Sequence, residues 1–295
     1  MDQRLLASAS VNQNCTVSIE ESSQFASALL LSAKMGGWQI KVTGESAEEA
    51  PYVTMTSKMI EVFPHQGGKF QIEPDASSGS YFFGAGWMLA KSEFGKALTK
   101  LAHDPAPPGE SSGLLYEKSQ IHVLNWPTSG WQLDADFTVF VQGETATHPA
   151  VISRSHDLAD ALMTAIVTAP FGRRTIRFTD LGRLRVQECE RVIALRTELT
   201  KCGTKVVEEG DTLTVYPSQL HGAEIETYND HRMAMCFAIL GLKVPGIRIK
   251  NPACVKKTFP NFFQKLAAPP PKGLGATIRD AKTGRALAHD ELFAD

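Results

Sequence analysis

Apolar side chains recur at helical spacing in four segments of the chain, which predicts four helices. The first covers residues 22–34 and stops at Gly36 and Gly37, since glycine commonly ends helices. The second begins at Pro51, a residue favoured in the first helical turn. The other two cover residues 157–170 and 188–202. The apolar positions that define the first two are Phe25, Leu29, Leu30 and Ala33, and Met55, Met59, Ile60 and Phe63.

Short runs with strand character follow these helices. Strands are expected at residues 38–42, 69–72 and 175–178, and residues 205–216 resemble a hairpin that turns at Gly210. A weaker copy of the same order is expected over residues 77–141. The recurrence suggests an internal repeat of roughly 65 to 80 residues, too long for most solenoids. We therefore predict an α/β (α+β) fold built from repeated units.

Three further segments complete the pattern. Residues 233–242 are apolar throughout and predict a buried helix, with a strand expected at residues 246–251. Residues 103–113 are rich in turn formers, which predicts an exposed loop. Residues 267–295 show little periodicity, which predicts a flexible tail.

Composition narrows the class of protein. Of the 295 residues 43% are hydrophobic and 21% are charged, which is typical of a globular chain long enough for two domains. The formal charge of −2 provides no general attraction for nucleic acid or an anionic membrane. Five cysteines without a C-x-x-C pair indicate reduced thiols in the cytoplasm. No zinc-binding pattern, signal peptide or membrane span is evident, so we expect no metal and no membrane partner.

Two clusters place cations at helix starts. Asp230 is a suitable N-cap, which puts His231 and Arg232 in the first turn of the buried helix. Cations there oppose the helix dipole, so a bound anion would explain them, although they could equally be solvated side chains. Arg183, Arg185, Glu188 and Arg191 repeat the pattern at another helix start, where a surface ladder of ion pairs is the alternative.

Other candidate side chains lie alone. Lys256 and Lys257 are on a connection, where site residues are common but solvated lysines are more so. Asp160 is expected in a helix that begins at residue 157, either as a general base whose pKa is tuned by burial or as a carboxylate favoured by the helix dipole. Hydroxyl groups at two helix starts are either caps or phosphate ligands. These are Ser22 and Ser23, beside Gln24, and Ser77 and Ser78.

Seven segments of the chain resemble the 5-enolpyruvylshikimate-3-phosphate (EPSP) synthase family, the 3-phosphoshikimate 1-carboxyvinyltransferases. They occur in the family's order and extend to about Leu266. The segments are SSQFASALLLSA from Ser22, PYVTMTSKMI from Pro51, EPDASSGSYF from Glu73, DLADALMTA from Asp157, RVQECERVIALRTELTKCG from Arg185, TYNDHRMAMCFA from Thr227 and KTFPNFFQKL from Lys257.

The resemblance implies a fold of two domains made of βαβαββ units. Residues 1–74 would be one repeat unit of an incomplete first domain, residues 75–266 the second domain, and residues 267–295 the flexible tail. It also implies a reaction of the shikimate pathway, which leads to aromatic amino acids. The enolpyruvyl group of phosphoenolpyruvate would move to the 5-hydroxyl of shikimate 3-phosphate, with loss of phosphate and without a cofactor or metal.

The resemblance assigns roles to residues. Asp160 would be the base for the attacking hydroxyl, and Glu188 would transfer protons at the enolpyruvyl methylene, with His231 beside them. Phosphoenolpyruvate would be held by Arg191, Arg232 and Lys257. The shikimate 3-phosphate site would include Ser22, Ser23, Gln24 and Tyr52.

The chain also departs from the family's pattern. About the first third is missing, Gln187 and Arg183 replace a lysine and an asparagine at substrate-binding positions, and Glu49 replaces a phosphate-binding serine. The lost part would ordinarily supply half of the cleft, so an N-terminal fragment or a second copy of the chain is an expected partner. The alternative is a non-catalytic relative that binds a phosphorylated small molecule or a protein.

Overall fold

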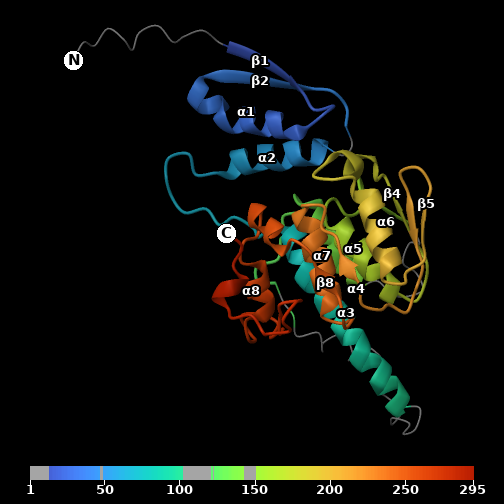
Figure 1. Ribbon diagram of the computed structural model, residues 1–295. Coiled ribbons are helices and arrows are strands. Elements are labelled where there is room, and N and C mark those ends of the chain that lie inside the picture. Colours follow the sequence, from blue (N-terminus) through green and yellow to red (C-terminus); the bar gives the residue numbers. More distant parts are fainter. Residues whose placement is uncertain (1–12, 47–48, 102–120, 122, 143–150) are drawn as a thin grey trace. The chain divides into compact units, whose positions relative to one another are not determined.

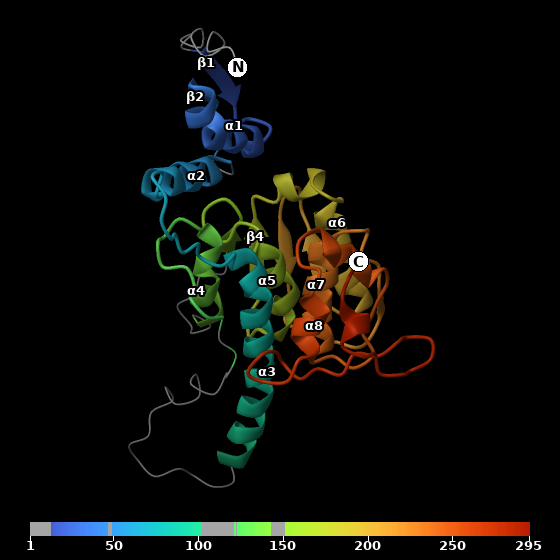
Figure 2. The same cartoon turned by 90° about the vertical axis from the view of Figure 1, so that its left-hand side faces the viewer.

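The chain forms two compact units, seen in the computed structural model as ribbons in Figure 1 and turned by 90° in Figure 2. The structure describes residues 13–46, 49–101, 121, 123–142 and 151–295. Unit 1 consists of Met1–Glu73 and Pro127–Leu133, and unit 2 of Pro74–Trp126 and Asp134–Asp295. The predicted loop at residues 103–113 lies outside the described residues.

Unit 1 is a two-stranded parallel sheet with two helices. Strand β1 (Gln13–Ser18) pairs with β2 (Trp38–Thr43), and α1 (Ser23–Gly36) connects them. Helix α2 (Ala50–Val62) packs against α1. Ser22 caps α1, and Gly37 ends it with a left-handed φ of 65°, which glycine adopts without strain. The first two predicted helices and the strand at residues 38–42 are therefore confirmed.

The strand predicted at residues 69–72 is wrong. The described chain has no strand there. Gly67 and Gly68 precede it with φ values of 92° and 143°, and no strand of the sheet in unit 1 lies beside it to form a ladder. Instead Phe70 packs edge-on against Phe63, with ring centroids 5.6 Å apart.

The weaker repeat copy predicted over residues 77–141 is also wrong for the described part of that segment. It begins with a single long helix, α3 (Ala76–Leu101), and continues after the undescribed residues with η3 (Leu133–Asp136) and α4 (Phe137–Gln142). Tyr81, Ala85 and Met88 of α3 are spaced four and three residues apart and at most 1% exposed. That spacing is helical, so one apolar face of α3 is buried in the core.

The middle of unit 2 contains the predicted order β-α-β-α-β-β. Its strands are β3 (Val151–Ser153), β4 (Ile176–Thr179), β5 (Val206–Glu208) and β6 (Leu213–Val215), and its helices are α5 (Leu162–Thr168) and α6 (Arg191–Lys201). The short helices η4 (Ala169–Phe171) and η5 (Gly182–Val186) follow α5 and β4. The strands lie in the order β3-β4-β6-β5, parallel between β3 and β4 and antiparallel elsewhere. The hairpin at Gly210 is confirmed.

Two predicted helices of this region begin later than expected. Asp157 accepts a hydrogen bond from the Ser153 backbone at 2.7 Å and holds a turn, so α5 begins only after Asp160. In α6 the Glu190 side chain caps the helix by accepting from Ile193, and Glu188 lies before the first turn. Asp160 and Glu188 are therefore on loops at helix starts rather than inside helices.

The last part of unit 2 repeats the parallel strand-helix-strand order. Strand β7 (Glu224–Ile225) pairs with β8 (Arg248–Ile249), and α7 (His231–Gly241) connects them. After η6 (Pro252–Lys257) and α8 (Phe262–Ala267) comes the segment predicted as a flexible tail, which includes η7 (Asp290–Leu292). Its last residues are packed, because Leu292 and Ala294 are 6% and 7% exposed and the Ala294 backbone donates to Pro260, whereas residues 268–291 are half-buried or exposed.

Helices α3, α5 and α7 pack against one another at the centre of unit 2, as both views show. From Met233 onward helix α7 is apolar on all sides and almost wholly buried, as predicted. The N-terminal ends of α5 and α7 and the first turn of α3 each contribute polar side chains to one cluster. Within the part of the chain that the structure describes, every helix is too short or too polar to cross a membrane.

Candidate active site at the start of α7

The start of α7 is shaped by an unusual backbone. Tyr228 and Asn229 have φ values of 54° and 56°, a conformation that costs non-glycine residues energy and often marks functional sites. The next residue, Asp230, is fully buried and caps α7 by accepting from the Arg232 backbone at 2.8 Å. The predicted cap is thus confirmed, and it fixes His231 and Arg232 in the first turn.

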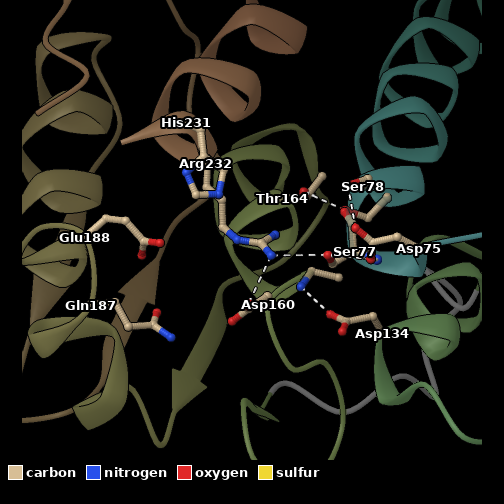
Figure 3. A network of polar contacts seen from close by, with 12 residues as sticks. Asp75, Ser77, Ser78, Asp134, Asp160, Thr164, Gln187, Glu188, His231 and Arg232 are labelled. Atoms are coloured by element: carbon tan, nitrogen blue, oxygen red, sulfur yellow. Dashed lines mark hydrogen bonds and ion pairs between the residues drawn. The ribbon is translucent and has the colours of Figure 1, made fainter. Parts of the chain in front are cut away.

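Arg232 is the centre of a polar cluster drawn in Figure 3. Its guanidinium group points to Asp160, with Nη2 3.0 Å from Oδ2, and donates to the Ser77 hydroxyl at 3.2 Å. It also lies 3.4 Å from the Tyr81 hydroxyl. These partners come from α3 and from the loop before α5. The structure therefore brings Asp160, Arg232 and Ser77 together from distant parts of the sequence.

Asp160 lies between two cations, since its Oδ1 accepts from Arg154 at 3.1 Å. Burial alone would raise the pKa of Asp160, but the charges of Arg232 and Arg154 outweigh it and hold the pKa well below its usual range. The sequence left open a base whose pKa is tuned by burial and a carboxylate favoured by the helix dipole. In the structure the two neighbouring cations, rather than burial, set the direction of the pKa shift.

A second cluster surrounds Arg191, which is only 1% exposed. Its Nε is 2.6 Å from Asp230 and its Nη2 is 2.6 Å from Glu188, while Nη1 donates to the Gln187 side chain. Each of its nitrogen atoms has a protein acceptor. Because a guanidinium group carries five N–H donors, two of them on Nη1, an anion can still contact Arg191 beside Gln187.

Glu188 connects this cluster to Lys257, whose Nζ lies 2.6 Å from Oε1. Burial tends to raise the pKa of Glu188, but the hydrogen bond from Lys257 and the charge of Arg191 bring it below its usual value. The Lys257 side chain remains 58% exposed. It can therefore turn to an incoming anion at little cost.

His231 is 3% exposed and stays neutral at physiological pH. Burial and the positive charge of Arg232 lower its pKa to about 4, against the smaller opposing effect of Asp230. A neutral imidazole can donate or accept a hydrogen bond, but it adds no charge to the site.

Not every candidate cation belongs to this cluster. Arg185 forms ion pairs with Glu208 and Asp211, both at 2.8 Å, and with Glu190, so the surface ladder describes it better than a ligand site. Lys256 donates to the carbonyl of Asp295 at 2.9 Å and holds the C-terminal segment. Arg183 is half-buried on η5.

Sequence inspection missed three members of the site. Arg154 pairs with Asp160, and Asp75 accepts from the Ser77 and Ser78 hydroxyls at 2.8 and 2.6 Å. Asp134 is 8% exposed and accepts from the backbone N–H of Ala161. Burial and the charge of Asp160 raise the pKa of Asp134. Asp75 lies within the segment EPDASSGSYF, which could have drawn attention to it, whereas Arg154 and Asp134 lie outside the seven segments.

The remaining candidates lie in unit 1, at the start of α1. Ser22 accepts from the Gln24 backbone at 3.2 Å, so its hydroxyl is a cap, and Tyr52 is half-buried on α2. Ser23 is buried, and its N–H donates to Glu49 Oε2 at 2.6 Å. Glu49 is itself only 7% exposed. A carboxylate of the chain therefore occupies this helix start, where an anion is favoured.

The cluster in unit 2 thus combines two exchangeable cations, Arg232 and Lys257, with two carboxylates, Asp160 and Glu188. Such an arrangement can bind a small molecule with more than one anionic group and move protons beside it. The five cysteines, including Cys189 at the edge of this site, are free thiols.

Comparison with known proteins agrees with this chemistry. A family model described as EPSP synthase (3-phosphoshikimate 1-carboxyvinyltransferase) matches residues 122–266. A protein of Pasteurella multocida named 3-phosphoshikimate 1-carboxyvinyltransferase is 33% identical over 269 residues, covering 82% of this chain and 57% of that protein. A protein of Nostoc punctiforme with the same name is 37% identical over 203 residues, covering 68% and 44%.

The chain therefore spans about half the length of the curated relatives it matches. A solved structure of EPSP synthase from Acinetobacter baumannii matches 37% of this chain and 26% of that chain, with 27% identity and a TM-score of 0.35. The fold described above does not rest on that match.

Proposed function

The chain belongs to the EPSP synthase family and has its α/β enolpyruvyl transferase-like fold, and from that premise we propose that it transfers the enolpyruvyl group of phosphoenolpyruvate to the 5-hydroxyl of shikimate 3-phosphate. One observation carries the proposal most directly. Two cation–carboxylate pairs, Arg232 with Asp160 and Lys257 with Glu188, lie around the start of α7. All four residues fall inside the matched range 122–266.

Arg232 and Lys257 hold the phosphate and carboxylate of phosphoenolpyruvate in this proposal. Each now pairs with a carboxylate of the chain, which an anionic substrate can replace. Arg191 orients Glu188 and Asp230 and helps to hold phosphoenolpyruvate in this proposal, through the second N–H of Nη1, whose other N–H donates to Gln187. His231 provides a neutral hydrogen-bonding group beside them.

Movement of Arg232 from Asp160 to the substrate phosphate also makes Asp160 a competent base. In the structure Arg232 and Arg154 hold its pKa low, which makes it a weak proton acceptor. When Arg232 turns to the substrate phosphate, Asp160 loses its strongest cation and its pKa rises. Substrate binding would thereby activate the base.

The proposed chemistry is addition followed by elimination. Asp160 takes the proton of the 5-hydroxyl as the hydroxyl oxygen bonds to C2 of phosphoenolpyruvate. When Lys257 turns to the substrate, the pKa of Glu188 rises, so Glu188 takes up a proton from solvent and delivers it to C3, which becomes a methyl group. A base then removes a proton from that methyl group. The double bond between C2 and C3 re-forms as the bond between C2 and the phosphate oxygen breaks and releases phosphate. Glu188 can serve both proton steps, because it ends the first step deprotonated.

Shikimate 3-phosphate is assigned to Ser22, Ser23, Gln24 and Tyr52, with Arg183 and Gln187 as further substrate-binding positions. Because the chain spans about half of its relatives' length, we propose that an N-terminal fragment or a second copy of the chain completes the site. A cytoplasmic location belongs to the same proposal.

Glu49 favours a second candidate function, a non-catalytic binder. Its buried carboxylate lies 2.6 Å from the Ser23 amide, where a substrate phosphate would need to bind. Two anions at one helix start repel each other, so shikimate 3-phosphate must displace Glu49 or bind elsewhere.

The test is phosphate release from shikimate 3-phosphate and phosphoenolpyruvate. The chain is assayed alone and mixed with the N-terminal part of a curated relative, with Asp160→Ala as the inactive control. We expect release in at least one preparation and a loss on the order of 100-fold or more with Asp160→Ala, because the general base is removed. Glu49→Ser should lower KM for shikimate 3-phosphate. Absence of release in both preparations would support the binder instead.

A further inference from the structure

Asp134 is a buried carboxyl group that the proposed chemistry does not use. It comes from η3, 27 residues before the amide it contacts, and its Oδ1 accepts the backbone N–H of Ala161. Figure 3 shows it beside Asp160 and below Arg232. A buried carboxyl group next to another acid costs free energy unless a hydrogen bond or a cation compensates for it.

The contact of Asp134 is not ordinary helix capping. A capping side chain accepts from the second or third N–H of a helix, which in α5 would be Met163 or Thr164. Asp134 accepts instead from Ala161, the residue directly after Asp160. It therefore acts on the peptide group that joins Asp160 to Ala161.

That peptide group is held at both of its polar atoms. The carbonyl of Asp160 accepts from the Met163 backbone at 3.3 Å, and the N–H of Ala161 donates to Asp134. Two hydrogen bonds on one rigid amide plane fix the backbone from which the Asp160 side chain projects. Without Asp134, the loop before α5 would have only one of these restraints.

We propose that Asp134 is a positioning residue that orients Asp160 by holding the Ala161 amide, and this role rests on the function proposed above. What it supplies is a hydrogen-bond acceptor in a fixed place. Its charge is not required, because the neighbouring Asp160 and Asp75 are also acidic and repel a carboxylate at this position. The change Asp134→Asn should therefore preserve the hydrogen bond to the Ala161 amide, whereas Asp134→Ala should remove it.

The test uses the full chain with Asp134→Asn, Asp134→Ala and the control Asp136→Ala, an exposed aspartate on the same short helix. The first measurement is hydrogen exchange at the Ala161 amide, which needs no substrate. We expect Asp134→Ala to speed exchange by about 10-fold or more, and Asp134→Asn and Asp136→Ala to leave it near wild type.

The second measurement is kcat and KM in whichever preparation releases phosphate. Asp134→Ala should lower kcat by roughly 10- to 100-fold with KM within about twofold, because the base is misplaced while substrate binding remains. Asp134→Asn should retain kcat, which a charge-dependent role would not allow. Unchanged exchange and kcat in Asp134→Ala, or an equal loss in Asp134→Asn, would overturn the assignment.

The two measurements separate the possible failures. If no preparation turns over, the proposed function fails, while exchange at Ala161 still decides the role of Asp134. If Asp134→Ala does not fold, the comparison of Asp134→Asn with wild type decides it, because loss of Ala161 protection there would contradict an acceptor role.

Discussion

Side chains around α7 owe their charge states to their partners as much as to burial. Asp160 and Asp134 are neighbouring aspartates, yet the pKa of one is lowered and that of the other raised. Two arginines lower the pKa of Asp160, whereas burial and the charge of Asp160 raise the pKa of Asp134 against the lowering effect of the Ala161 amide. Two aspartates of one site thus have pKa values shifted in opposite directions.

His231 gives a testable consequence at the residue scale. Its pKa is about 4 in the folded chain and about 6.5 when unfolded, so between these pH values only the unfolded chain takes up the proton. Stability contributed by the neutral imidazole is therefore present above pH 6.5 and lost as the pH falls. From pH 7 to pH 4 wild type should lose about 3 kcal/mol more unfolding free energy than His231→Gln.

Urea unfolding monitored by circular dichroism at several pH values measures this difference. His289→Gln is the control, because it removes an exposed histidine of the same unit. Parallel curves for wild type and His231→Gln would contradict the lowered pKa.

At the scale of elements, the site depends on how closely α3 and α5 approach. Gly84 of α3 faces Thr164 of α5, where an added Cβ would lie 2.9 Å from the threonine methyl group. Close to this contact, Ser80 and Thr164 share a hydrogen bond of 2.8 Å between their hydroxyl groups. The spacing sets the distance between Ser77 at the start of α3 and Asp160 before α5.

Gly84→Ala should therefore destabilise the chain by about 1–3 kcal/mol from overpacking, reduced by the roughly 1 kcal/mol that alanine gains over glycine in a helix. Thr164→Ser removes the opposing methyl group and keeps the hydroxyl. In a double-mutant cycle, the loss of unfolding free energy in the double variant should be smaller than the sum of the two single losses by about 1 kcal/mol. Additive effects would show that the two helices do not limit each other there.

At the scale of the whole molecule, the C-terminal segment is part of unit 2. Leu292 belongs to the same buried cluster as the helices of the core, and the Ala294 backbone is bonded to Pro260. Lys256, next to the site residue Lys257, donates to the last residue of the chain. The segment therefore supports η6, which carries Lys257.

Leu292→Ala should lower the unfolding free energy by about 2 kcal/mol or more, because it empties a buried position. The adjacent Phe293 is 46% exposed, so Phe293→Ala should cost about 1 kcal/mol at most. Urea unfolding of the full-length variants measures both. Equal losses, or none for Leu292→Ala, would mean that the segment is not packed in solution.

The sequence by itself determined the elements whose signal is local. Helices α1, α2 and α7, the hairpin at Gly210 and the Asp230 cap were all predicted, because spacing of apolar residues, glycine stops and capping side chains act within a few residues. The family was also identifiable from short segments such as TYNDHRMAM.

Only the tertiary structure decided the rest, because those features depend on contacts between distant residues. In the described part of the chain residues 69–72 have no strand partner, and Leu292 and Ala294 are buried in the core of unit 2. The low pKa of Asp160 arises from two arginines that lie 6 and 72 residues away, and Asp134 reaches the Ala161 amide across 27 residues. The spacing of apolar residues along the sequence does not indicate such pairs, because they form only once the chain has folded.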